Sequence, residues 1–312
     1  MFGVDIGNSG LRIAELHVAT QAIGPRMRIN WLPPGTPIQS ETAAVRYEPA
    51  DEAWLEELSE FTKVKGATWL VSSVRRDAIQ VLEESLASES CDLRADLIRV
   101  HHSHLPLDVN VDAPDRVGID RLLAGLAGGH FLREQTGFEQ YAGAAIVIQA
   151  GSAVTVDEIS LPSEPAGSSA AAEKLIFHGG AILPGIPLML RMLGAGTDQL
   201  PKMNADNLTS LPEIPGKNTE EAMLCGAASA LLGGVSHVVE RYRQGHRRGR
   251  SPHKNLLDGQ DSASNGEWNV PVILSGGDGM RISPHLSSPV FVHSDLVLQG
   301  LTVLARYSDF GS

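Results

Sequence analysis

Apolar runs and amphipathic stretches alternate along the first part of this chain. Residues 1–6 form an apolar run that contains Asp5, and after a Gly-Asn-Ser-Gly turn the chain alternates between apolar and polar positions. This pattern predicts a strand, a tight turn and a returning strand. Similar patterns predict strands over 68–74 and 97–100, helices over 51–64 and 76–88, and a proline-containing loop over 24–40. Strands that alternate with helices indicate a layered α/β domain.

The second half of the chain repeats the opening design. An apolar strand over 144–148 runs into Gln149 and a Gly-Ser turn, from which a strand returns over 153–157. Two strand–turn–strand units half a chain apart predict a duplicated fold with two phosphate-facing hairpins. We place the two domains at 1–116 and 117–312.

Further elements are expected in the second domain. These are flexible segments over 161–173 and 244–268, a helix over 187–193, a helix from 219 to about 243, a strand from 272 into a Gly-rich turn, and a closing helix from 295. The long helix opens on a capping box, with Asn218 as N-cap and Glu221 at N3. Its many Ala and Gly residues allow a close approach of two backbones, and we expect the closing helix to pack on this domain.

Composition narrows the classes of function. The chain has 312 residues, 42% of them hydrophobic, which fits a globular protein with full cores. A net charge of -12 argues against non-specific nucleic-acid binding, which needs a basic surface. Cys91 and Cys225 form neither a zinc spacing nor a disulfide framework, so a reducing cytoplasm is expected. With no signal peptide and no apolar run of about 20 residues, no membrane partner is expected.

The first hairpin has the features of a phosphate site. Gly7 and Gly10 remove side chains where the backbone approaches another group or takes positive φ, and Asn8 and Ser9 add small polar groups. Asp5 at the strand end can orient Mg²⁺ through water while backbone N–H groups meet phosphate oxygens. An ordinary edge hairpin has the same pattern, and short glycine motifs are common. The other motifs of the chain are therefore needed to choose between a phosphate site and an ordinary hairpin.

Asp120 and Arg121 stand side by side before an expected helix over 122–130, with Gly118 just upstream. One interpretation is a capping Asp with a surface Arg. The other is a general base beside a cation that holds an anionic substrate, and the residues alone leave both open. A nearby loop carries three histidines that lack a carboxylate or Cys partner, which favours solvated side chains over a metal site: His101, His102 and His104.

Taken together, these motifs resemble the type III pantothenate kinases of the actin-like ATPase superfamily. The matching stretches are 5–9, 117–121, 151–157, 179–185, 218–219 with Gly226, 275–278 and 300–301. The resemblance implies two ribonuclease-H-like domains and ATP-dependent phosphorylation of pantothenate, the first step of coenzyme A biosynthesis. It also implies a homodimer with the pantothenate pocket near the subunit interface.

The resemblance also implies roles for single residues. ATP phosphates and Mg²⁺ would be bound by Asp5, Ile6, Gly7, Asn8, Ser9, Gly10, Leu11 and Arg12, with Ser152 as a further ATP contact. Pantothenate would be bound by Gly118, Ile119, Asp120, Arg121 and Thr219, with Asp120 as proton acceptor. This agrees with the chemistry, because a hydroxyl that attacks the γ-phosphate needs positioning and a nearby carboxylate, and an Arg suits the carboxylate of the substrate.

Three positions depart from the family pattern. Gln149 stands where the family carries an Asp that binds a monovalent cation, K⁺ or NH₄⁺; Ser152 replaces a Thr, and Val111 replaces a Tyr. Retention of Asp120 favours an active kinase. Gln149 and Val111 favour two alternatives: a non-catalytic, nucleotide-binding regulatory relative, or a kinase for another small hydroxy acid or amide.

Overall fold

The computed structural model describes residues 1–31, 46–62, 66–88, 95–134, 143–161, 174–203, 213–247, 270–287 and 289–307. It divides into two compact units, each treated by itself below: 1–106, 113–127 and 296–312 form the first, and 107–112 and 128–295 form the second. This division differs from the boundary expected at residue 116. Most of the segments expected at 161–173 and 244–268, and Cys91, lie outside the described residues.

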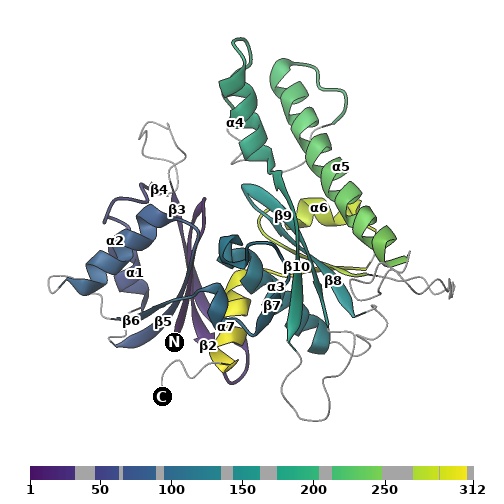
Figure 1. The fold of residues 1–312 in the computed structure, drawn as a ribbon. Coiled ribbons are helices and arrows are strands. Elements are labelled where there is room, and N and C mark those ends of the chain that lie inside the picture. The colour runs from purple at the N-terminus through teal and green to yellow at the C-terminus, as the bar shows by residue number, and fades with distance from the viewer. Residues whose placement is uncertain are drawn as a thin grey trace. The chain divides into compact units, whose positions relative to one another are not determined.

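The first unit is built on a six-stranded sheet (Figure 1). Its strands, in spatial order, are β4 (Arg46–Tyr47), β3 (Ala22–Trp31), β2 (Gly10–His17), β1 (Phe2–Ile6), β5 (Ala67–Ser73) and β6 (Ala95–Arg99). Strand β1 is antiparallel to β2 and parallel to β5. The expected loop over 24–40 was wrong up to residue 31, because β3 continues through Pro25. That proline lies where the β2–β3 register shifts, a place at which a strand tolerates proline.

Helices cover both faces of this first sheet. Helices α1 (Leu55–Thr62) and α2 (Arg76–Ala87) share one buried cluster with Phe2, Val4 and Ile6 of β1. Helix α7 (Leu296–Tyr307) packs against β1, β2, β3 and β5. The expectation that the closing helix packs on the second domain was therefore wrong. All five residues of β1 are buried, so both faces of its sheet need a cover, and α7 supplies the second.

A glycine in α7 allows this helix to approach a neighbouring helix closely. A Cβ atom on Gly300 would lie 2.2 Å from the carbonyl oxygen of Leu123, in helix α3 (Ile119–Glu134). Only glycine allows this contact without a shift of one helix. The apolar residues on either side, Leu298 and Leu301, are wholly buried. Gly300 and Leu301, quoted above as a family motif, therefore act in packing.

The second unit holds a sheet in which the corresponding strands have the same spatial order. Its strands, in spatial order, are β12 (Val290–Val292), β11 (Val272–Ser275), β8 (Ala144–Ala150), β9 (Ala153–Ser160), β10 (Leu175–Pro184) and β7 (Leu107–Val109). The hairpin β8–β9 matches β1–β2, and β11 is parallel to β8 as β5 is to β1. One connection differs, since β7 precedes its hairpin in sequence whereas β4 follows. The two sheets confirm the predicted duplicated α/β fold.

The helices of the second unit are α4 (Ile186–Gly196), α5 (Thr219–Arg247) and α6 (Gly279–Ile282). The N-cap half of the predicted capping box at α5 is confirmed, since Asn218 Oδ1 accepts the N–H of Glu221 at 2.8 Å. The Glu221 side chain bonds one residue further back, where its Oε2 accepts the N–H of Lys217 at 2.7 Å. Helix α5 ends at residue 247, so residues 244–247 are helical rather than loop. By length and composition α5 could cross a membrane, but Leu231 and Val235 join the core of the second sheet.

Candidate active site

The first hairpin places Asp5 at the end of a wholly buried strand. Asp5 is 2% exposed, and its Oδ2 forms an ion pair with Nη2 of Arg12, the residue opposite it on β2. On its other side Asp5 is in register with Ser72 of β5. The Ser72 hydroxyl is buried and has no hydrogen-bond partner within the described part of the chain. One sheet face therefore presents a carboxylate, a guanidinium and an unsatisfied hydroxyl side by side.

The two glycines of the hairpin differ in what the fold requires of them. A Cβ on Gly10 would lie 2.2 Å from the carbonyl oxygen of Ile29 on β3, so Gly10 permits a close approach of two strands, as predicted. A Cβ on Gly7 would meet only the Gly10 oxygen, at 3.6 Å, and neither glycine has positive φ. Packing therefore requires glycine at position 10 but not at position 7. Asn8 and Ser9 are exposed at the tip.

The pair Asp120–Arg121 lies in the first turn of α3, in the first unit. The N–H of Arg121 donates to Asp120 Oδ1 at 2.9 Å and to the carbonyl of Gly118 at 3.0 Å. A Cβ on Gly118 would lie 2.5 Å from Asp120 Oδ1, so the glycine leaves the space into which this carboxylate folds. Asp120 is the second residue of α3, so it is not the N-cap that the simpler interpretation required. Both side chains are half-buried.

The second hairpin places Gln149 where the first places Asp5. Gln149 is in register with Thr155 on β9 and with Ser275 on β11, as Asp5 is with Arg12 and Ser72. The Thr155 hydroxyl is buried, and the described residues offer it no hydrogen-bond partner. This second face therefore presents neutral oxygen atoms, in contrast to the ion pair on the first.

Ser152 lies at the tip of the second hairpin, where the chain packs against the start of α4. Its carbonyl accepts the N–H of Gly185 at 2.9 Å. A Cβ on Gly185 would lie 2.3 Å from the Gly151 oxygen, so glycine at position 185 allows this close approach to the turn. Thr219 is the exposed first residue of α5, also in the second unit. Val111 lies against Gly179, whose φ of +85° forms a bend beside it.

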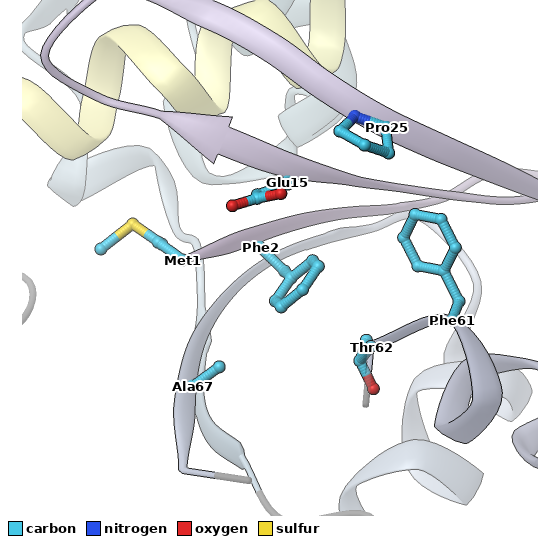
Figure 2. Close-up of a pocket in the computed structure, with 7 residues that line it drawn as sticks. All are labelled: Met1, Phe2, Glu15, Pro25, Phe61, Thr62 and Ala67. Atoms are coloured by element: carbon cyan, nitrogen blue, oxygen red, sulfur yellow. The ribbon is translucent and has the colours of Figure 1, made fainter. Parts of the chain in front are cut away.

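Two other features do not form a catalytic site. His102 to His104 form a short 3₁₀ turn, and within the ranges given above no group of three or more His, Cys, Asp or Glu side chains is arranged to hold a metal. A pocket of about 260 Å³ lies at the start of β1, the end opposite the hairpin (Figure 2). Its walls include Phe2, Phe61 and the carboxylate of Glu15. Apolar rings and a negative charge do not suit a phosphate.

Sequence reasoning missed two residues that touch the first hairpin. The indole nitrogen of Trp31, on β3, donates to the carbonyl of Gly7 at 3.0 Å. The guanidinium of Arg75, which precedes α2, donates to the carbonyl of Asn8 at 3.3 Å. Both residues are far from the hairpin in sequence, and no local pattern marks them. The pairing of β3 with β2 and of β5 with β1 brings them there.

The chain matches one family over most of its length. A family model for type III pantothenate kinases matches residues 1–241. A type III pantothenate kinase of Rhodopirellula baltica is 35% identical over 145 residues, 46% of this chain and 45% of that protein. One from Chromobacterium violaceum is 31% identical over 240 residues, 76% of this chain and 79% of that protein. The matched region runs from the first hairpin to beyond Thr219 and so includes every predicted site residue.

Solved structures were compared as well. An inorganic polyphosphate/ATP-glucomannokinase from Arthrobacter sp. strain KM aligns over 99% of both chains, with 15% identity and a TM-score of 0.42. A ROK hexokinase from Thermus thermophilus aligns over 98% of both chains, with 11% identity and a TM-score of 0.39.

Proposed function

The chain belongs to the type III pantothenate kinase family, and from that premise we propose that it transfers the γ-phosphate of ATP to the primary hydroxyl of pantothenate. The product is 4′-phosphopantothenate, and the reaction opens coenzyme A biosynthesis. The family match over residues 1–241 carries this proposal. The paired hairpins and the Asp120–Arg121 turn support it, because each offers a group that the reaction needs.

The first hairpin is proposed to hold the ATP phosphates together with Mg²⁺. The Asp5 carboxylate and the unsatisfied Ser72 hydroxyl are oxygen groups of the kind that hydrogen-bond to the water shell of Mg²⁺. Mg²⁺, when bound, neutralises charge on the phosphate oxygens. Arg12 balances the buried charge of Asp5 and places a cation beside the same face. Asn8, Ser9 and Gly10 at the tip are proposed to supply backbone N–H groups. Ile6, Gly7 and Leu11 are proposed as further ATP contacts on the family resemblance, as is Ser152 of the second hairpin.

Asp120 is proposed as the general base. The hydroxyl oxygen of pantothenate bonds to the γ-phosphorus, the bond from that phosphorus to the ADP oxygen breaks, and the hydroxyl proton passes to the carboxylate of Asp120. Arg121 holds the substrate carboxylate, for which a guanidinium is suited. Gly118 keeps the space beside Asp120 open. Ile119 and Thr219 are proposed as further pantothenate contacts on the family resemblance.

The second hairpin is proposed to bind a monovalent cation weakly. Gln149 brings a neutral amide where the family has a carboxylate, and a carboxylate attracts a cation more strongly than a dipole does. The unsatisfied hydroxyl of Thr155 lies beside it in register. We therefore propose that activity depends only weakly on K⁺ or NH₄⁺, and that the amide takes part of the role of the cation by donating to a phosphate oxygen.

A homodimer in the cytoplasm is also proposed. On α5, a Cβ on Gly226 or Gly233 would meet nothing within 4 Å, so this helix face is open to a second backbone. Large apolar side chains are exposed in the same unit, with Ile182 63% and Met192 63% exposed. A two-fold dimer is the commonest soluble assembly.

An ADP-release assay with ATP, Mg²⁺ and pantothenate tests the activity, with Asp120→Asn as the matched control. We expect pantothenate-dependent release by the wild type and almost none by the variant. The alternative, a nucleotide-binding regulatory relative, is favoured by Gln149 and Val111. It predicts ATP binding without pantothenate-dependent release, and that result would replace our proposal.

A further inference from the structure

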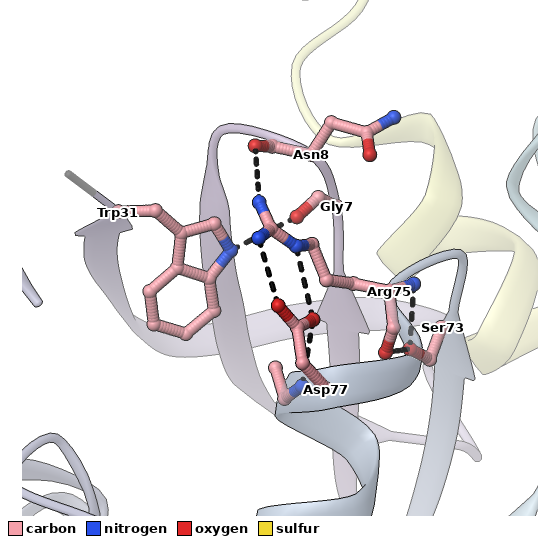
Figure 3. Close-up of polar contacts among 7 residues, drawn as sticks. Gly7, Asn8, Trp31, Ser73, Arg75 and Asp77 are labelled. Atoms are coloured by element: carbon pink, nitrogen blue, oxygen red, sulfur yellow. Dashed lines mark hydrogen bonds and ion pairs between the residues drawn. The ribbon is translucent and has the colours of Figure 1, made fainter. Parts of the chain in front are cut away.

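The carbonyl groups of Gly7, Asn8 and Ser9, at the tip of the first hairpin, accept hydrogen bonds from residues outside the hairpin; Figure 3 shows the contacts of Gly7 and Asn8. The Trp31 indole N–H donates to Gly7 O at 3.0 Å, and the Trp31 backbone N–H donates to Ser9 O at 3.1 Å. Between them, Arg75 Nη1 donates to Asn8 O at 3.3 Å. Three successive carbonyl groups therefore accept hydrogen bonds from β3 and from the residue before α2.

Arg75 is itself fixed in place. Its Nε and Nη2 donate to the two carboxylate oxygens of Asp77 at 3.0 and 2.8 Å, a two-pronged pair that sets the plane of the guanidinium. Asp77 lies in the first turn of α2, where it also accepts the N–H of Ala78 at 2.9 Å. The hydrogen bond from Arg75 lowers the pKa of Asp77 below its ordinary value. The Ser73 hydroxyl donates to the Arg75 carbonyl at 2.9 Å, which holds its backbone.

Trp31 is held by packing. It is 3% exposed, and its ring meets the ring of Trp54 edge to face, with centroids 5.6 Å apart. An aromatic pair of this geometry restricts ring rotation and directs the indole N–H to one acceptor. The two donors thus come from rigid elements of the first unit rather than from mobile surface side chains.

The geometry of the peptide bond converts these contacts into an orientation of N–H groups. In a planar trans peptide, the N–H points opposite to the C=O of the preceding residue. When the carbonyls of Gly7, Asn8 and Ser9 are directed toward Trp31 and Arg75, the N–H groups of Asn8, Ser9 and Gly10 are turned away from those two side chains. An array of successive N–H groups with a common direction is the arrangement that receives phosphate oxygens.

We propose that Arg75 and Trp31 are positioning residues of the phosphate site, which fix the tip peptides so that their N–H groups face the ATP phosphates. This rests on the proposed function only in naming ATP as the ligand. Arg75 acts through the Asn8 carbonyl while it remains paired with Asp77. It therefore differs from a residue that leaves its partner to bind the phosphate directly.

Binding of MgATP, measured by calorimetry, tests the positioning role with two matched pairs of variants. Arg75→Met is compared with Arg76→Met, because Arg76 is the exposed neighbour on α2. Trp31→Phe is compared with Trp69→Phe, because the Trp69 indole nitrogen is also buried without a hydrogen-bond partner in the described structure, and the Trp69 ring contacts Phe2 rather than Trp31. Loss of one positioning hydrogen bond predicts a rise in Kd of about three- to tenfold for Arg75→Met and for Trp31→Phe, with little change in either control. Equal effects in variant and control would overturn the proposal.

Two further variants separate positioning from direct phosphate binding. Asp77→Asn loosens the guanidinium, so a positioning role predicts weaker MgATP binding, whereas a direct ligand released from Asp77 would bind MgATP more tightly. Arg75→Lys keeps the charge but cannot form the two-pronged pair. It should resemble Arg75→Met, and wild-type affinity in Arg75→Lys would show that charge alone suffices.

Hydrogen exchange gives a readout that does not depend on catalysis. In the absence of nucleotide, amides of residues 7–11 should exchange faster in Arg75→Met and Trp31→Phe than in the two controls, with thermal melting used to confirm that all four variants fold. Unchanged exchange in folded variants would contradict the proposal. A wild type that binds MgATP but does not phosphorylate pantothenate would defeat the proposed function alone, because neither binding nor exchange requires pantothenate.

Discussion

Substitution of Gly10 by Ala tests how the first hairpin is built. The added Cβ would lie 2.2 Å from the Ile29 carbonyl oxygen and 3.2 Å from the Cα of Asn30. An ordinary carbon–oxygen contact is about 3.3 Å, so β2 and β3 must separate locally by roughly 1 Å. A shift of that size carries neighbouring ladder hydrogen bonds from about 2.9 Å to beyond their useful range. The loss of one or two such bonds costs about 1–3 kcal/mol of folding free energy.

This cost converts into a measurable change in melting temperature. At about 2–4 °C per kcal/mol, Gly10→Ala should lower the Tm by roughly 2–12 °C in a circular dichroism melt. MgATP binding should weaken as well, because the Trp31 N–H to Ser9 O bond is the next rung of the same ladder. Gly7→Ala is the control, since a Cβ there meets only one oxygen, at 3.6 Å. A Gly10→Ala protein as stable as Gly7→Ala would refute the packing argument.

The other predictions concern chemistry and assembly. Asp120→Asn should lower turnover at saturating pantothenate by about 10²–10⁴-fold while MgATP still binds; turnover within a few-fold of wild type would remove Asp120 from the role of base. Replacing KCl by an organic cation at constant ionic strength should change wild-type activity little, whereas Gln149→Asp should gain a K⁺ requirement; a strong requirement in the wild type would refute this. Light scattering at micromolar concentration should give the mass of two chains, and a one-chain mass would count against the dimer. The hydrogen bond to Glu57 raises the pKa of Tyr47 to about 12. The contribution of this hydrogen bond to folding stability is therefore full below pH 10 and is lost as pH rises toward 12. Urea unfolding of Tyr47→Phe should accordingly show a smaller loss of stability over that pH range than the wild type.

Local patterns were sufficient for the two hairpins and for the N-cap of α5. The apolar runs that end at Asp5 and at Gln149 are both short, and each is followed by a turn that contains glycine. These residues alone predict each strand–turn–strand hairpin. The Asn218–Glu221 spacing likewise predicted a contact made within four residues. Interactions between residues close in sequence can therefore be predicted from the local pattern.

Contacts between elements that are far apart in sequence could not be predicted from local patterns. Strand β3 was missed because its proline indicated a loop, whereas a shifted register with β2 accommodates it. Helix α7 was assigned to the wrong sheet, because an apolar helix does not specify which of two similar sheets it covers. Arg75 and Trp31 reach the hairpin only through the alignment of strands. The prediction that glycine is needed for a close backbone approach was right for Gly10, which faces a neighbouring strand. At Gly7 the packing does not require glycine.

Direct detection of the product tests the central claim. The wild-type protein is incubated with ATP, Mg²⁺ and pantothenate, and phosphorus NMR follows the reaction with mass spectrometry of the organic product. The account predicts one phosphomonoester of pantothenate for each ADP formed, and at least about a hundredfold slower formation of both products by Asp120→Asn. ADP without phosphopantothenate, or no reaction from a protein that binds MgATP, would contradict it.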